Sequence, residues 1–176
     1  MNSKPIKVCI AGATGWAGSL LSRGVCNAEN LQLIAGVSRS NAGKTLNDIL
    51  GLEGEPIPIY GVATEALLIG CDVFVEYTKP NVAKANILAA LRAGSNVVVG
   101  TSGLTSDDYS EIEKLALELQ KSVLAVGNFA LTAVLMQKFS EIAARYIPSW
   151  EIIDYAHQAK ADVPSGTARE LADFYV

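Results

Sequence analysis

Three glycines, Gly12, Gly15 and Gly18, follow a short apolar run at residues 6–11 and precede apolar residues at helical spacing. A strand, a glycine turn and a helix in this order are typical of a loop that binds a diphosphate. Gly12 would let the strand turn tightly, Gly15 would let a phosphate approach bare backbone, and Gly18 would let the helix pack closely. Free amides at the helix start would face the anion. Strand–helix packing alone is the alternative; the position directly after the first strand favours nucleotide binding.

The end of the next predicted strand, residues 31–37, carries Ser38-Arg39-Ser40. In a dinucleotide-binding fold the adenosine ribose lies at this point, and an acidic residue would select NAD through the ribose 2′-hydroxyl. A guanidinium flanked by hydroxyls suits a 2′-phosphate instead, so we expect NADPH to be preferred and NADH to be possible. A solvated loop arginine is the alternative.

Two further polar turns follow predicted strands. Residues 71–77 form a strand pattern that ends in Thr78-Lys79-Pro80, and residues 94–103 repeat the order of capping glycine, buried strand and small polar turn. Ligands of open parallel sheets lie beyond the carboxyl ends of the strands, so we expect Thr78 and Lys79 near the nicotinamide half of a cofactor. Pro80 is explained by ordinary chemistry at a helix start.

A last group of polar residues lies near the C-terminus. Hydroxyl-bearing residues and the Thr167-x-x-Glu170 spacing, typical of a capping box, predict a helix that begins near Ser165 or Thr167. Free amides at Gly166 and Thr167, with Lys160 upstream, would suit a carboxylate. Composition alone favours the alternative, a capped helix with a solvated lysine.

The elements that must position these groups alternate regularly. Six strand patterns separated by helical patterns predict a mostly parallel, doubly wound Rossmann-type α/β sheet, which we assign to a dinucleotide-binding domain at residues 1–129. A helical pattern over 132–146 and an alternating strand pattern over 149–155 begin an α+β substrate-binding domain, residues 130–176. A helix opened by Thr105 is expected to bury four residues at helical spacing: Ile112, Leu115, Ala116 and Leu119.

Composition narrows the ligand class. The 176 residues are 50% hydrophobic and 18% charged, which excludes disorder and suffices for one domain or one domain and part of another. The net charge of −4 without a basic cluster argues against nucleic acid and anionic membranes, so we expect a small-molecule ligand. Cys9, Cys26 and Cys71 are far apart and the chain has one histidine, so we expect reduced thiols, no metal site and a cytoplasmic protein. No targeting or membrane-spanning segment is visible.

Five motifs occur in a characteristic order: Gly12-Ala13-Thr14-Gly15-x-x-Gly18, Glu76-Tyr77-Thr78-Lys79-Pro80, Gly100-Thr101-Ser102-Gly103-Leu104, Gly127-Asn128-Phe129 and Lys160-x-Asp162-x-Pro164-Ser165-Gly166-Thr167-Ala168. Together they resemble the 4-hydroxy-tetrahydrodipicolinate reductase (dihydrodipicolinate reductase) family over essentially the whole chain. The last motif is highly specific, whereas the glycine loop alone is not.

The resemblance implies NAD(P)H-dependent reduction of 4-hydroxy-tetrahydrodipicolinate, a cyclic unsaturated dicarboxylate, in the diaminopimelate route of lysine biosynthesis. A non-catalytic NADP-binding module and a reductase with another cyclic dicarboxylate substrate are the alternatives. With Thr78 added for its place at a strand end, the expected cofactor-binding residues are Gly12, Ala13, Thr14, Gly15, Trp16, Ala17, Arg39, Thr78, Gly100, Thr101, Ser102, Val126, Gly127, Asn128 and Phe129. Lys160 would donate a proton or act as the electrophile beside the imine, with His157 as the second catalytic residue. The residues implied to bind substrate are His157, Lys160, Ser165, Gly166 and Thr167.

This chain departs from the family pattern in two ways. The family usually carries a His-His pair where this sequence has Ala156-His157, and the first histidine of the pair is the general acid. Alanine cannot transfer a proton, and loss of a positioned general acid typically costs about 10²- to 10⁴-fold in rate. Either His157 or Lys160 takes over that role, or the substrate is a related one.

The second departure is length, because family members continue with further strands of the substrate domain. We therefore expect this chain, which ends at Val176, to be a fragment. The resemblance also implies a homo-tetramer assembled through that domain. The expected location is the cytoplasm, or a plastid if a transit peptide has been removed.

Overall fold

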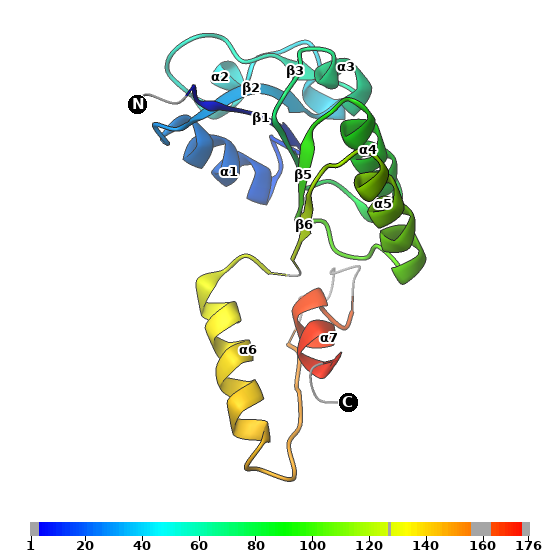
Figure 1. The fold of residues 1–176 in the computed structure, drawn as a ribbon. Coiled ribbons are helices and arrows are strands. Elements are labelled where there is room, and N and C mark those ends of the chain that lie inside the picture. Colours follow the sequence, from blue (N-terminus) through cyan, green and yellow to red (C-terminus); the bar gives the residue numbers. More distant parts are fainter. Residues whose placement is uncertain (1–3, 127, 156–162, 174–176) are drawn as a thin grey trace. The chain divides into compact units, whose positions relative to one another are not determined.

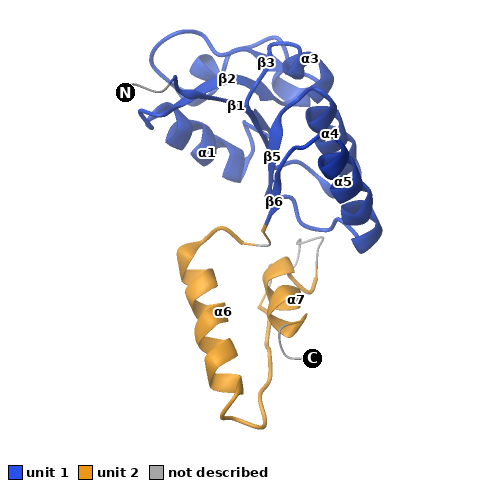
Figure 2. Cartoon of the chain, viewed as in Figure 1, with its two compact units in different colours: residues 1–125 blue, residues 126–176 orange. Residues whose placement is uncertain are grey.

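The computed structural model describes residues 4–126, 128–155 and 163–173. The chain forms two compact units, an N-terminal unit of residues 1–125 and a C-terminal unit of residues 126–176, which Figure 2 shows in different colours. Within the described residues, no helix combines the length and the apolar character needed to cross a membrane.

The N-terminal unit is built on one six-stranded sheet in the order β3-β2-β1-β4-β5-β6, in which every neighbouring pair is parallel (Figure 1). The chain starts in the middle, winds to one edge and then returns to extend the other. This reversal between β1 and β4 is where doubly wound sheets bind ligands. The strands are β1 (Ile6–Ala11), β2 (Leu31–Val37), β3 (Ile59–Tyr60), β4 (Val73–Glu76), β5 (Asn96–Val99) and β6 (Val123–Ala125). The prediction of a Rossmann-type parallel sheet is confirmed.

Helices connect the strands and supply the outer layers. They are α1 (Trp16–Cys26), the short 3₁₀ helix η1 (Arg39–Asn41), α2 (Leu46–Leu50), α3 (Ala63–Leu67), α4 (Pro80–Arg92) and α5 (Ser106–Glu118). The predicted start of α5 is confirmed, because the Thr105 hydroxyl accepts a hydrogen bond from the Asp108 amide and the Asp108 carboxylate accepts one from the Thr105 amide. This reciprocal pair is a capping box.

The sheet separates two clusters of buried side chains. Cys9 and Ala11 of β1 belong to the cluster that includes residues of α3, α4 and α5, whereas Val8 and Ile10 belong to the one that includes residues of α2. Successive residues of a strand point to opposite faces, so a strand covered on both sides needs apolar residues throughout. This explains the continuous apolar run at residues 8–11.

One expected core residue of this unit is not in the core. Ile112 and Ala116 of α5 are buried and Leu115 packs against them, but Leu119 is exposed. Leu119 is the C-terminal cap of α5, where the helix ends, so the helical spacing no longer carries the side chain toward the sheet.

The described part of the C-terminal unit contains two helices, α6 (Leu131–Ala144) and α7 (Gly166–Asp173). The Gln137 amide of α6 donates a hydrogen bond to the Glu170 carboxylate of α7 at 3.2 Å, and the Asn128 amide donates to the Thr167 hydroxyl at 3.1 Å. These polar contacts connect α7 to the middle of α6 and to the residues directly before α6.

Two local predictions for this unit are wrong. Residues 149–155 form no strand, and Tyr155 is 93% exposed. A strand needs a neighbour to complete its ladder, and the described residues of this unit include none. The second is the capping box of α7. The helix begins at Gly166 and is capped by a hydroxyl as predicted, because the Ser165 hydroxyl accepts the Ala168 amide at 3.1 Å. The Thr167 and Glu170 side chains, however, bond to residues outside the helix instead of to each other.

Candidate functional site

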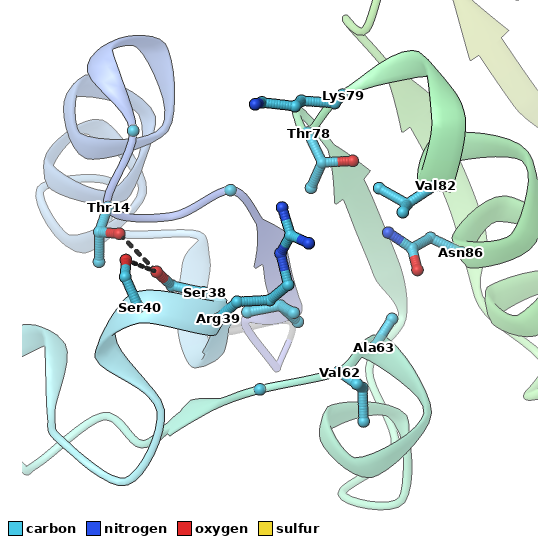
Figure 3. A pocket seen from close by; sticks show the side chains of 14 residues that line it. Thr14, Ser38, Arg39, Ser40, Val62, Ala63, Thr78, Lys79, Val82 and Asn86 are labelled. Carbon is cyan, nitrogen blue, oxygen red and sulfur yellow. Dashed lines mark hydrogen bonds between the residues drawn. The ribbon is translucent and has the colours of Figure 1, made fainter.

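A cavity of about 720 Å³ opens at the carboxyl ends of β1, β2 and β4 in the N-terminal unit (Figure 3). Its walls come from the glycine loop after β1, residues 37–40 at the end of β2, residues 61–63 after β3, and the turn after β4 together with the first turns of α4. These four segments are separated in sequence and meet only because parallel strands end at one edge of the sheet. The cavity therefore lies at the topological switch point of the fold.

The glycine loop is shaped by contacts that exclude side chains. Gly12 has φ +80°, and a Cβ there would lie 2.2 Å from the Tyr77 carbonyl oxygen. A Cβ on Gly18 would lie 2.0 Å from the Gly12 carbonyl oxygen, so α1 packs closely on the loop. A Cβ on Gly15 would meet only the Gly12 carbonyl oxygen, at 3.1 Å, and Gly15 lines the cavity. The strained turn and the close packing expected of Gly12 and Gly18 thus have a physical cause in the structure.

Hydroxyl groups join the glycine loop to the turn after β2. The Thr14 and Ser38 hydroxyl oxygens lie 2.8 Å apart, and the Asn41 amide donates to the Thr14 hydroxyl at 3.2 Å. The Ser40 hydroxyl lies 3.4 Å from that of Ser38. This network holds the turn that carries Arg39 against the glycine loop.

Two cations face this cavity. Arg39, the first residue of η1, and Lys79, at the N-terminus of α4, are both exposed and both line it (Figure 3). None of the described residues that line the cavity is acidic. Two positive charges without a carboxylate partner in the wall favour an anionic ligand.

Glu76, the last residue of β4, lies fully buried behind the cavity wall. Its Oε1 accepts hydrogen bonds from the Thr78 amide at 2.8 Å, from the Thr78 hydroxyl and from the Thr101 hydroxyl at 3.4 Å, and its Oε2 accepts one from the Asn86 amide at 2.9 Å. Burial raises the pKa of this carboxyl group, and the hydrogen bonds oppose that shift. Glu76 thereby ties together the turns after β4 and β5 and the helix α4.

Several expected cofactor residues have structural contacts of their own. The Thr101 hydroxyl is buried and lies 3.3 Å from the carbonyl oxygens of both Glu76 and Thr78, and a Cβ on Gly100 would lie 2.0 Å from the Tyr77 ring. Ala13 is buried in the core, so only its backbone can face a ligand, and Trp16 is exposed at the start of α1. Six of the expected cofactor residues of the N-terminal unit are not among those that line the cavity: Ala13, Trp16, Ala17, Gly100, Thr101 and Ser102.

The remaining site residues belong to the C-terminal unit. Val126, Asn128 and Phe129 precede α6, and the side-chain oxygen Oδ1 of Asn128 accepts a hydrogen bond from the Ala130 backbone amide at 2.8 Å. Gly127, His157 and Lys160 lie outside the described residues.

Near α7 the structure places an internal carboxylate. Asp154 accepts a hydrogen bond from the Ser165 amide at 2.7 Å, directly before the helix. Gly166 and Thr167 occupy the first two positions of α7, where amides have no partner within the helix. The residues that line a cavity of about 420 Å³ include Asp154, Ser165 and Thr167.

Sequence reasoning missed part of the cavity wall. Gly61, Val62, Ala63, Val82 and Asn86 line it without belonging to a recognised motif. The available sequence signal was an acidic residue, Glu76, within the apolar strand pattern of residues 71–77, because a carboxylate in a buried strand needs hydrogen-bond partners from neighbouring elements. The described residues contain no cluster of three or more metal-ligating side chains, and all three cysteines are free thiols.

Comparison with known proteins gives consistent results over the whole chain. Residues 6–129 match the family model described as dihydrodipicolinate reductase, N-terminus, and residues 132–175 match the model for the C-terminus of the same family. The chain is 39% identical over 168 residues to 4-hydroxy-tetrahydrodipicolinate reductase of Syntrophomonas wolfei. This match covers 95% of this chain and 63% of that relative. The same enzyme of Geobacillus kaustophilus is 38% identical over the same shares of both chains.

A solved structure agrees with these relatives. Dihydrodipicolinate reductase of Paenisporosarcina sp. TG-14, in complex with dipicolinate, has a TM-score of 0.76 and 32% identity to this chain, and the match covers 97% of this chain and 65% of that one. The present chain thus spans less than two thirds of the length of these relatives. On the matches of both of its parts, the chain belongs to the dihydrodipicolinate reductase family.

Proposed function

We propose that the cavity of the N-terminal unit binds NADPH, with NADH as a weaker ligand. The family binds a pyridine nucleotide. The observation that carries the preference is the pair of exposed cations, Arg39 and Lys79, in a wall whose described residues include no carboxylate. Arg39, flanked by two serines, would bind the 2′-phosphate of NADPH, because a guanidinium forms strong, directional hydrogen bonds with phosphate. NADH lacks this phosphate and would lose those bonds.

We also propose that the chain takes part in the reduction of 4-hydroxy-tetrahydrodipicolinate. The relatives carry that enzyme name, and the solved relative is described as bound to dipicolinate, a cyclic dicarboxylate. The reduced nicotinamide supplies a hydride when it is bound. Lys160 and His157, assigned by matching position, would supply the proton and positive charge on the substrate side.

In the same proposal the start of α7 binds a substrate carboxylate. The Ser165 amide is taken by Asp154 and the Ala168 amide by the Ser165 hydroxyl. The amides of Gly166 and Thr167 therefore remain available for a carboxylate in the described part of the chain, and the helix dipole favours an anion there.

A second candidate is a module that binds NADP without turnover, which the replacement of the usual first histidine by Ala156 favours. The two are distinguished by measuring NADPH binding and NADPH oxidation with enzymatically generated substrate. Turnover supports the reductase. Tight binding without turnover supports the module, and failure to bind NADPH contradicts both.

Three other expectations remain part of this proposal. The domain boundary between residues 129 and 130 is proposed from the sequence pattern. The homo-tetramer and the cytoplasmic location are proposed from the family resemblance.

A further inference from the structure

The cavity presents its groups in the same order as the parts of a dinucleotide. The glycine loop with Thr14 lies at one end, Ser38 and Arg39 come next, and apolar side chains with one amide follow (Figure 3). Within the adenosine half of the cofactor the covalent order is diphosphate, ribose and adenine. If the first two groups contact phosphate and ribose, the base falls toward the other end of the cavity, where the lining side chains include Val62, Ala63, Val82 and Asn86.

Asn86 carries the only amide side chain among the described residues that line the cavity, and this amide has a defined orientation. The amide nitrogen donates to Glu76 Oε2 at 2.9 Å, and Figure 3 shows the amide oxygen on the side of Ala63. The opposite orientation would bring the amide oxygen against the carboxylate oxygen of Glu76, where neither atom has a proton to donate. The described hydrogen bonds to Glu76 all come from donors, so its carboxyl oxygens act as acceptors and fix Asn86 as a hydrogen-bond acceptor toward the cavity.

We propose that Asn86 reads the adenine base by accepting a hydrogen bond from its exocyclic amine, and that Glu76 is the positioning residue that holds the amide in this orientation. The inference rests on the proposed binding of NADPH in this cavity. Guanine and hypoxanthine carry an oxygen at the corresponding position, which would face the Asn86 oxygen as a second acceptor. The pair Glu76 and Asn86 thus selects adenine against these bases.

Replacing the carboxylate by an amide should reverse this selection. In Glu76→Gln, Oε1 can keep its bonds from Thr78 and Thr101, and the new Nε2 takes the place of Oε2 opposite Asn86. Two amide nitrogens would then face each other, so Asn86 would turn its oxygen toward Gln and its nitrogen toward the cavity. A donor in that position prefers the oxygen of hypoxanthine.

The test compares NADPH with the reduced form of nicotinamide hypoxanthine dinucleotide phosphate, in which an oxygen replaces the exocyclic amine of the base. Calorimetric titration of the whole chain should give a dissociation constant on the order of tenfold lower for NADPH, since one hydrogen bond is exchanged for a repulsive contact. The ratio of the dissociation constant of the hypoxanthine dinucleotide to that of NADPH, about ten in the unaltered chain, should fall to about one in Asn86→Leu and below one in Glu76→Gln. Asn81→Leu, an exposed residue of α4 outside the cavity, is the matched control and should leave the ratio unchanged.

The ratio distinguishes reading of the base from a structural role, because a damaged cavity would weaken both ligands alike. Equal affinity of the unaltered chain for the two dinucleotides overturns the inference while leaving the proposed function intact. Failure to bind either one overturns both. If Glu76→Gln does not give a cooperative thermal transition, Asn86→Leu still decides, since an unchanged tenfold ratio in that variant contradicts the proposal.

Discussion

The two units of this chain solve the problem of burying apolar side chains in different ways. In the N-terminal unit the sheet separates two clusters of buried residues, and β1 contributes to both. In the C-terminal unit the large side chains of α6 are exposed, among them Leu131 at 72% and Phe139 at 64%. Of its described residues only Gln137, Ser165 and Leu171 are buried.

This difference has a physical reason and a functional consequence. A sheet covered on both faces encloses apolar residues on every strand, whereas two helices joined by polar contacts enclose few. The cavity of the N-terminal unit is therefore supported by a packed core. The start of α7, where we propose that a carboxylate binds, is supported by hydrogen bonds such as those of Asp154 and Gln137. We expect the N-terminal unit to determine cofactor binding and stability, and the C-terminal unit to determine chemistry.

The largest expected effect tests this division directly. Lys160→Ala should lower NADPH oxidation by about 10²- to 10⁴-fold, as is typical for the loss of a positioned proton donor. The dissociation constant for NADPH should stay nearly unchanged, because the residue is assigned to the substrate. Steady-state kinetics and calorimetric titration measure the two quantities. Lys114→Ala, at an exposed position of α5, is the control, and an equal loss of binding and turnover in Lys160→Ala would contradict the assignment.

The next effect concerns the stability of the N-terminal unit. Gly18→Ala should destabilise the chain by about 3 kcal/mol, because the new Cβ would lie 2.0 Å from the Gly12 carbonyl oxygen and the backbone would have to move. Gly24→Ala in the same helix meets nothing within 4 Å and should stabilise it by about 0.5 to 1 kcal/mol. Denaturant unfolding measures both variants. A similar response to the two substitutions would show that the close packing of α1 on the glycine loop does not limit stability.

A third prediction sharpens the account of the cofactor. Arg39→Ala should raise the dissociation constant for NADPH by about 10- to 100-fold, the value of a charged hydrogen bond to phosphate, and change that for NADH little. Titration with both dinucleotides gives the ratio of the two constants. An unchanged ratio would refute the role of Arg39 at the 2′-phosphate. Lys44 does not line the cavity, so Lys44→Ala is the control, and a change of the same ratio in that variant would show an effect of overall charge.

The smallest effect compares surface carboxylates of the two units at varied pH. The backbone amide of Thr105 and the ammonium of Lys84 lower the pKa of Asp108 to about 2, below its ordinary value of 3.8. A lowered pKa in the folded state contributes stability above the ordinary value, and this contribution is lost as the pH falls from about 4 to about 2. Asp108→Asn should therefore lower the melting temperature at neutral pH and leave it unchanged near pH 2.

Glu141→Gln is the matched variant in the C-terminal unit. The pKa of Glu141 is lowered by Lys138 and Arg145 on one exposed helix face, so its effect on melting should be close to zero. If Glu141→Gln destabilised the chain more than Asp108→Asn, the cooperative stability would not lie mainly in the N-terminal unit.

Much of the fold could be predicted because its signals are local. The apolar runs at residues 6–11 and 31–37 have the bounds of β1 and β2, and Thr105 begins α5 as the capping pattern indicates. Prediction failed where the outcome depends on a partner, as for the expected strand at residues 149–155. It also failed for the capping box at Thr167, since the helix already begins after Ser165 and the Thr167 hydroxyl accepts a hydrogen bond from Asn128, a residue distant in the sequence.

The candidate site divides in the same way. Gly12, Gly18 and Arg39 were identified from the sequence because a turn and a strand end are defined within a few residues. Asn86 and Val62 were not, since they lie on separate elements and meet only through the order of the strands.

The sequence by itself determined the alternation of strands and helices, the glycine turn and the family of the chain, because each depends on neighbouring residues or on the linear order of motifs. Tertiary structure alone decided that Glu76 would be buried beneath the cavity and that its carboxylate would fix the amide of Asn86. The physical reason is that a buried carboxyl group needs hydrogen-bond donors from the residues that the sheet brings to it, and these include residues of α4 and of the turn after β5.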